Sequence, residues 1–288
     1  MIECKNCHTR TRADHLIEDF IQANKHLNLV PLMQSKRDID ISDNEIENAF
    51  KTGKVEGWST DKMDYFIRSF GIPCPNCNGN DGSKWTPVRK FNLLFETHLG
   101  IIEGEKSKAY LRGEIAQGIF LNFKNVLNTT RVRVPFGIAQ QGKAFRNEIT
   151  MGQFVHRTLE FDLMEFEYFI NSEDWEKTFE MWKNEMWKFA KDLGLKEENL
   201  RWREHEEFER SHYSKRTMDV EYKYPFGFKE MFGIAYRTDF DLKNHQENSG
   251  KDLSYTDPNT NEKYIPHVVE PTFGLSRLTG IEIGRAHV

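Results

Sequence analysis

The sequence lacks a long hydrophobic run and a strong excess of either charge. Its 288 residues contain no stretch of about 18 apolar residues, the length that crosses a bilayer, and no segment of signal-peptide type opens the chain. The formal net charge of -5 excludes a uniformly basic coat for nucleic acid, so any RNA contact must be confined to one face. These absences predict a cytoplasmic protein that does not span a membrane.

Cysteine is scarce, and its four copies form two Cys-x-x-Cys pairs. Cys4 and Cys7 make the first pair, and Cys74 and Cys77 make the second. If the two pairs come together in the fold, their four thiolates could bind one tetrahedral zinc ion, so the spacing predicts a structural zinc site. Because residues 8–73 separate the pairs, simple burial of the thiols stays open as an alternative.

Residues 1–83 read as a small helical insertion that contains both cysteine pairs. Ser42 and Glu45 make a capping box that predicts a helix over 43–52, and a second short helix is expected over 60–71.

Residues 84–281 contain short β-prone segments separated by glycine and proline, with amphipathic helices between them. This pattern predicts an α+β fold in which helices flank an antiparallel sheet. Strands are expected at 132–140, 143–149, 157–170, 218–223 and 265–270, and helices at 114–128, from the N-cap Ser172 to Gly194, and after Arg277.

Strand alternation places two candidate pairs of side chains. Arg146 and Glu148 would share a face of one strand, and Phe161 and Glu165 would share a face of the next. Together they would offer charge and a stacking surface.

Seven segments stand out in the chain, in this order: 12–14 (RAD), 89–95 (RKFNLLF), 110–122 (YLRGEIAQGIFLN), 135–149 (PFGIAQQGKAFRNEI), 157–169, 224–237 (YPFGFKEMFGIAYR) and 268–277 (VVEPTFGLSR). Together they resemble glycyl-tRNA synthetases of the dimeric class II type. The resemblance covers nearly the whole chain and implies the fold of a class II aminoacyl-tRNA synthetase core.

The resemblance implies a reaction in which ATP activates glycine to glycyl-adenylate, followed by transfer to tRNA(Gly). Because negative oxygen gathers in the transition state, cations must be fixed in place beforehand. Arg146 is expected to clamp the α-phosphate, Arg277 the γ-phosphate, and Glu230 to hold Mg²⁺; these three form the implied catalytic set. The implied ATP-binding residues are Arg146, Asn147, Glu148, His156, Arg157, Thr158, Phe161, Glu230, Met231, Gly274 and Arg277.

The same residues have plainer interpretations when each is taken alone. Arg146 would form a surface ion pair with Glu148, Phe161 would pack in the core, and Glu230 would be a solvated carboxylate. The motif context favours instead stacking of Phe161 on adenine and acceptance of its amine by Glu148.

Glycine has no side chain, so selection must rest on its ammonium group and on exclusion of larger amino acids. Glu114, Glu165 and Glu270 match positions around the amino group, where charge-assisted hydrogen bonds are strongest. Three converging carboxylates repel one another without a cation, so the alternative is that one of them faces solvent. The implied glycine-binding residues are Arg12, Glu114, Phe161, Glu165, Glu270, Thr272 and Gly274.

The sequence departs from the family at Gly113 and Ile115, which flank Glu114, and at Leu159, where an arginine is usual. The family's first signature and its anticodon-binding domain have no counterpart in it. Residues 282–288 (EIGRAHV) back-translate to DNA that resembles a sequencing adapter. We therefore expect a catalytic core truncated at both ends, a non-native tail at 282–288, and a homodimer at full length.

Two rival functions follow from the same features. One is a catalytically silent class II synthetase-like interaction module, similar to the accessory subunit of mitochondrial DNA polymerase. The other is a zinc-knuckle nucleic-acid-binding protein centred on the cysteines. Retention of Arg146, Glu148, Phe161, Glu230 and Arg277 favours the enzyme over the silent module.

Overall fold

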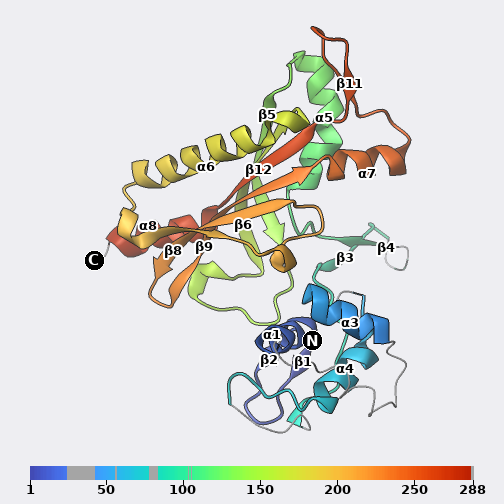
Figure 1. Cartoon of the computed structure of the whole chain (residues 1–288), viewed down its shortest axis with the longest axis vertical. Helices are drawn as coiled ribbons and strands as arrows, with labels where there is room; N and C mark the ends of the chain where they lie inside the picture. Colours follow the sequence, from blue (N-terminus) through green and yellow to red (C-terminus); the bar gives the residue numbers. More distant parts are fainter. Residues whose placement is uncertain (25–42, 56, 78–83, 103, 105, 287–288) are drawn as a thin grey trace. The chain divides into compact units, whose positions relative to one another are not determined.

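The computed structural model describes residues 1–24, 43–55, 57–77, 84–102, 104 and 106–286. The chain divides into two compact units (Figure 1). The first comprises Met1–Leu93 with Asn147–Met151, and the second comprises Leu94–Arg146 with Gly152–Val288. No helix in these described ranges has the length and apolar character that a membrane span needs.

The first unit is a small helical body beside a two-stranded ribbon. Strands β1 (Ile2–Glu3) and β2 (Arg10–Thr11) pair antiparallel, and the helices are α1 (Ala13–Ala23), α3 (Asp43–Thr52) and α4 (Thr60–Ser69). The helices expected over 43–52 and 60–71 are confirmed, and Ser59 caps α4 by accepting from the backbone N–H of Lys62 at 3.2 Å. Ser42, expected to cap α3, lies outside the described residues. The core side chains are all buried: Ile17, Ile21, Phe66, Ile67 and Trp85.

The second unit is built on a six-stranded antiparallel sheet, which confirms the α+β expectation. The strand order is β5-β6-β12-β9-β8-β7. The strands are β5 (Phe136–Phe145), β6 (Glu160–Ile170), β7 (Leu200–Glu204), β8 (Arg216–Tyr224), β9 (Gly227–Thr238) and β12 (His267–Gly274). The helices are α5 (Ala116–Thr130), α6 (Trp175–Asp192), α7 (Phe240–Ser249) and α8 (Leu275–Ala286).

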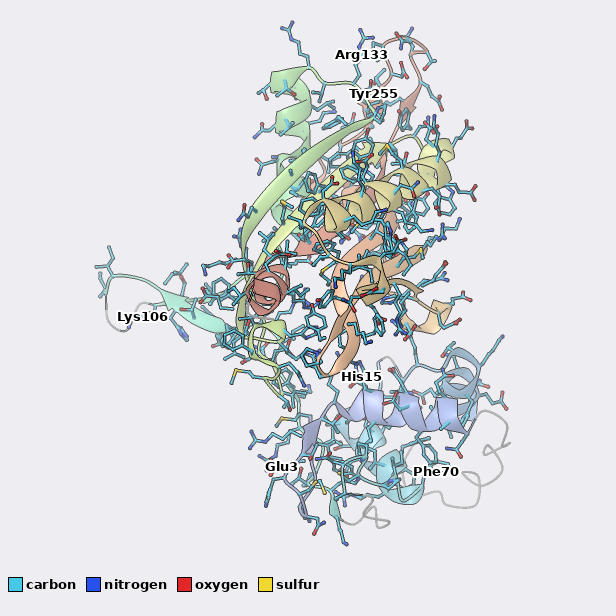
Figure 2. The ribbon with its side chains drawn as sticks, turned by 90° about the vertical axis from the view of Figure 1, so that its left-hand side faces the viewer. Glu3, His15, Phe70, Lys106, Arg133 and Tyr255 are labelled. Atoms are coloured by element: carbon cyan, nitrogen blue, oxygen red, sulfur yellow. The ribbon has the colours of Figure 1, made fainter. Side chains whose placement is uncertain are left out.

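Two short ribbons complete this unit. Strands β3 (Glu96–Leu99) and β4 (Ser107–Tyr110) form one, and β10 (Tyr255–Thr256) and β11 (Lys263–Tyr264) form the other. In the second ribbon the ring of Tyr255, labelled in Figure 2, meets the ring of Tyr264 edge-on at 5.7 Å.

The two faces of the large sheet differ in chemistry because side chains alternate along each strand. On one face, α6 packs against β9 and β12, and the layer between them is aromatic and aliphatic (Figure 1). Met164 and Phe166 of β6 and Phe232 of β9 belong to that layer. The opposite face carries Glu165 and Glu167, with α5 and α7 covering one end of it. We call this second surface the acidic face.

Three local predictions are wrong in detail. The strands expected at 132–140 and 143–149 are the single strand β5, which runs through Gly142 without a break. Since β5 ends at Phe145, Arg146 and Glu148 do not share a strand face. Ser172 is not the cap of α6, because residues Ser172–Asp174 form a 3-10 turn whose cap is Asn171.

Candidate active site and cysteine cluster

The acidic face is organised around a buried arginine at the end of β9. Arg237 is 2% exposed and donates from Nε and Nη2 to the Asp241 carboxylate at 2.8 and 2.9 Å. Its Nη1 donates to both oxygens of Glu270 at 3.0 Å. The ring of Tyr213 lies 3.9 Å from the guanidinium carbon. These contacts fix a cation between two carboxylates from α7 and β12.

Two further carboxyls of β6 lie on this face. Glu165 is 4% exposed and Glu167 is fully buried, and within the described structure Oε2 of Glu165 and both oxygens of Glu167 have no hydrogen-bond partner. Burial, with Glu270 and Glu114 nearby, raises the pKa of Glu165 to about 8. Burial also raises the pKa of Glu167 well above its usual value, and Glu270 adds to the effect. Glu165 therefore holds a proton at neutral pH, and the pKa of Glu167 is shifted in the same direction.

Arg146 and Phe161 meet where β5 ends and β6 begins. Nε of Arg146 donates to the carbonyl of Gly113 at 2.8 Å, and its guanidinium carbon lies 5.5 Å from the Phe161 ring centroid. Phe161 is half-buried against the small cluster of Ile115, Ala144 and Leu163. One side of the ring is thus supported by the core, and a cation lies over it.

Arg277, Glu230 and His156 form a second charged group. Nη1 of Arg277 lies 2.9 Å from Oε2 of Glu230, and its Nε donates to the carbonyl of His156 at 3.2 Å. Surrounding protein raises the pKa of the Glu230 carboxyl, although the side chain is 48% exposed, but Arg277, His205 and His156 together lower it below its usual value. Burial and Arg277 lower the pKa of His156 to about 4, so its ring is neutral at pH 7.

The antiparallel topology brings the Arg146 group and the Arg277 group to the same end of the sheet. At this end β5 and β12 finish, and β6 and β9 begin. Gly274 ends β12, and a Cβ there would lie 3.0 Å from the Met231 carbonyl and 3.2 Å from Cδ of Arg277. Glycine therefore permits this close approach. Thr272, further back on β12, pairs with Glu165 on one side and with Gly233 on the other.

The remaining predicted residues of the second unit differ in burial. Met231 is fully buried in the apolar layer under α6, Glu114 is half-buried, and Arg157 is exposed. The hydroxyl of Thr158 donates to the carbonyl of Glu160 at 2.7 Å. The charge of Glu114 acts on the acidic face, where it contributes to the raised pKa of Glu165 and of Glu270.

Three predicted site residues belong to the first unit. Arg12 donates to Asp14 from Nε at 3.1 Å and from Nη2 at 2.5 Å. The backbone N–H of Asn147 donates to the carbonyl of Leu93 at 2.8 Å, and Glu148 interacts electrostatically with Arg12. Their contacts with glycine or ATP stay predictions.

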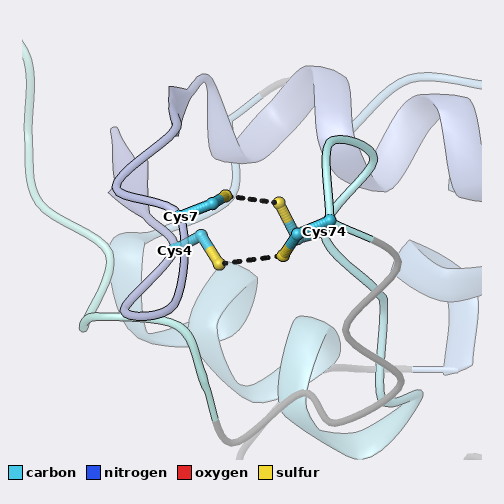
Figure 3. A group of neighbouring side chains, drawn as sticks. Cys4, Cys7 and Cys74 are labelled. Carbon is cyan, nitrogen blue, oxygen red and sulfur yellow. Dashed lines mark hydrogen bonds between the residues drawn. The ribbon is translucent and has the colours of Figure 1, made fainter.

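The four cysteines gather at one point of the first unit (Figure 3). The Sγ atoms of Cys4 and Cys77 lie 3.8 Å apart, those of Cys7 and Cys74 lie 3.6 Å apart, and all four lie within 4.8 Å of one another. Four thiolates at zinc–sulfur distances of about 2.3 Å in a tetrahedron would be about 3.8 Å apart. The cluster could therefore bind a metal ion.

Sequence reasoning missed three residues of the acidic face: Glu167, Arg237 and Asp241. A sequence signal was present for Glu167 alone, which follows Glu165 by two residues on a predicted strand and so had to share its face. Arg237 lies in β9 and Asp241 in α7, so no local pattern predicted the ion pair that joins them.

An antiparallel sheet with cations at one end and buried carboxylates behind them is consistent with a class II aminoacyl-tRNA synthetase core. Comparison with curated proteins makes the assignment more specific. The chain is 46% identical over 278 residues to a glycine–tRNA ligase of Caldanaerobacter subterraneus subsp. tengcongensis, 48% identical to that of Acetivibrio thermocellus and 45% identical to that of Clostridium acetobutylicum. Each similarity covers 96% of this chain and 54% of the relative.

The chain spans about half the length of the curated relatives it matches. No family model matches it. The resemblance to glycyl-tRNA synthetases is nevertheless confirmed, since it extends over nearly the whole chain in relatives from several organisms.

Proposed function

We propose that this chain contains the core that activates glycine with ATP and passes the glycyl group to tRNA(Gly). The observation that carries the proposal is the combination of buried carboxylates behind two arginine-centred groups on one sheet. The name of the relatives, glycine–tRNA ligase, supports the same substrate. A silent interaction module is not favoured, because such a module has no chemical reason to retain this set of charged residues.

In the first step a carboxylate oxygen of glycine attacks the α-phosphorus of ATP. The bond to the bridging oxygen breaks, and pyrophosphate leaves. Arg146 neutralises charge on the α-phosphate and Arg277 on the γ-phosphate, because planar guanidinium groups suit phosphate oxygens. Phe161, supported from below by Ile115 and Leu163, offers its ring to adenine.

A divalent cation would be held at Glu230. Its carboxylate stays ionised at neutral pH, since Arg277 keeps the pKa below its usual value, and hard oxygen ligands are those that Mg²⁺ prefers. When bound, Mg²⁺ supplies positive charge to the phosphate oxygens. Arg277 would then exchange its present contact with Glu230 for phosphate.

Glycine would be recognised through its ammonium group by Glu165 and Glu270, with Glu114 and Thr272 beside them. Larger amino acids would be excluded by overlap with pocket atoms, since no side-chain binding energy is needed for glycine. We further infer a cytoplasmic enzyme that acts as a homodimer.

We infer that the cysteine cluster holds a structural zinc ion. The four sulfur atoms match the spacing of a tetrahedral zinc–thiolate site, and sulfur donors favour zinc over magnesium or calcium. Elemental analysis of the purified chain should find about one zinc per chain, and Cys74→Ser should lose it. A chain with fully reduced thiols and no bound zinc would contradict this inference.

Glycine-dependent exchange of pyrophosphate into ATP tests the proposed reaction. We expect exchange with glycine but not with alanine or serine, and Arg146→Ala should reduce it about 100-fold to 1000-fold. Lys188→Ala, an exposed change on α6, should leave the rate unchanged. Exchange that is independent of glycine would reject the proposal.

A further inference from the structure

The acidic face holds more carboxyl groups than its buried cation can balance. Asp241 and Glu270 both pair with Arg237, whereas Glu165 and Glu167 are buried without an ion-pair partner in the described structure. Four ionised carboxylates against one guanidinium would leave three uncompensated negative charges in a buried site. Such charges are strongly unfavourable unless they are paired or protonated.

Charged and titratable groups face this carboxyl pair from every surrounding element. Glu165 interacts with Glu270 of β12, with Glu114 before α5, with Arg237 of β9 and with Arg146 after β5. Glu167 interacts with Glu270, Arg237, Glu165 and Asp241 of α7. The ring of Tyr213 lies against the Arg237 guanidinium, and burial and Glu270 raise the pKa of its hydroxyl. Around Glu165 two carboxylates face two cations, so burial is the main reason that its carboxyl keeps a proton. Around Glu167 three carboxylates face one cation, which adds to the effect of burial.

The two carboxyl groups differ in access. Glu167 is fully buried, and neither of its oxygens has a partner, so no ligand can reach it without rearrangement. Glu165 retains 4% exposure and lies opposite Thr272, the β12 residue that the proposed function assigns to the glycine pocket. Its unpartnered oxygen is the available acceptor for a cation that enters the acidic face.

We propose that glycine binds to this face by exchanging its ammonium group for the proton on Glu165, so that binding releases about one proton while Glu167 stays neutral. The O–H bond of the Glu165 carboxyl breaks, its proton passes to solvent, and an ammonium N–H donates to the carboxylate. The total charge of the buried site is the same before and after binding. This inference rests on the proposed function, because it takes glycine as the ligand.

Calorimetric titration of the chain with glycine tests the exchange. At one pH, the difference in heat between phosphate and Tris buffers gives the number of protons released. With the pKa of Glu165 at about 8, we expect about 0.9 proton at pH 7.0 and about 0.25 at pH 8.5. The apparent dissociation constant for glycine should fall about 50-fold between pH 6 and pH 8. Binding without proton release would overturn the exchange but leave the proposed function intact.

Two matched variants locate the proton. Glu167→Gln should still release about 0.9 proton at pH 7.0, because Glu167 is neutral in both states. Glu165→Gln should release none. Release that persists in Glu165→Gln, or that disappears in Glu167→Gln, would assign the proton to another group and contradict the proposal.

A measurement without ligand covers the case in which Glu165→Gln no longer binds glycine. Because the pKa of Glu165 is raised from 4.5 to about 8 by folding, its contribution to stability is present below about pH 4.5 and is lost as pH rises to about 8. The melting temperature of Glu165→Gln should therefore exceed that of the native chain by an amount that grows from pH 5 to pH 8. A change that is equal at all pH values would reject a proton on Glu165. If this change occurs but the native chain binds no glycine, the proposed function fails instead.

Discussion

The two faces of β6 differ in chemistry, since one carries apolar side chains and the other carries buried carboxyl groups. Met164, Phe166 and Tyr168 pack with the helix α6, where burial of apolar surface is favourable and independent of pH. Glu165 and Glu167, which alternate with them, are buried against carboxylates on the other face. The comparison shows that the apolar face stabilises the fold, whereas the buried carboxyl groups of the acidic face destabilise it. Such a cost in stability is expected where residues are retained for function.

Removal of the central cation should have the largest effect on stability. Arg237→Met leaves the buried carboxylates of Asp241 and Glu270 without the cation that pairs with them, and we expect a loss of about 3 to 5 kcal/mol in the free energy of unfolding at pH 7.5. The loss should be smaller at pH 5, because the pKa of Glu270 is already raised by burial and its protonation removes a charge. Urea unfolding at the two pH values measures both quantities.

An exposed ion pair provides the control for this variant. Lys263 and Asp252 lie 2.8 Å apart, with side chains 60% and 56% exposed. Lys263→Met should change the unfolding free energy by less than about 1 kcal/mol, since water screens such pairs. Equal losses of unfolding free energy in Arg237→Met and Lys263→Met would mean that burial does not strengthen the dependence of the acidic face on its cation.

Replacement of the unpartnered carboxyl should have an intermediate effect of the opposite sign. Glu167→Met removes a buried group with no hydrogen-bond partner, and we expect a gain of about 1 to 3 kcal/mol at pH 8. Because folding raises the pKa of Glu167 above 4.5, its contribution to stability declines as pH increases, so the gain should be larger at pH 8 than at pH 5. Thermal unfolding at both pH values measures it, and a net loss of stability would show that Glu167 has a stabilising partner.

Parts of this contrast could be predicted from the sequence because they depend on local spacing. Four aromatic residues of α6 that pack on the sheet are spaced three, four or seven positions apart, at Trp175, Phe179, Trp182 and Phe189, which fits the helical period. The alternation in β6 follows from the strand period of two residues. Phe161 and Glu165 were accordingly expected on one face, and the alternation of burial in β6 agrees with this.

The central strand β9 and the ion pairs of Arg237 could not be predicted in the same way. Beyond Glu230, β9 is buried on both faces and includes Gly233, so it shows no simple alternation. Arg237 meets Glu270 from 33 positions away, and only the order of strands brings them together. The register shift between Val268 and Val269 lies beside this contact, and no local pattern in the sequence specifies it.

The smallest expected effect comes from trimming the apolar face. Ile234 of β9 is 1% exposed in the layer beneath α6, on the opposite side of the strand from Arg237. Ile234→Val removes one methylene group and should lower the unfolding free energy by about 0.5 to 1.5 kcal/mol. Since no ionisable group of the acidic face is altered, the loss should be the same at pH 5 and pH 8, measured by urea unfolding. A pH-dependent loss would mean that packing on one face changes ionisation on the other, and the two faces could then not be treated as independent.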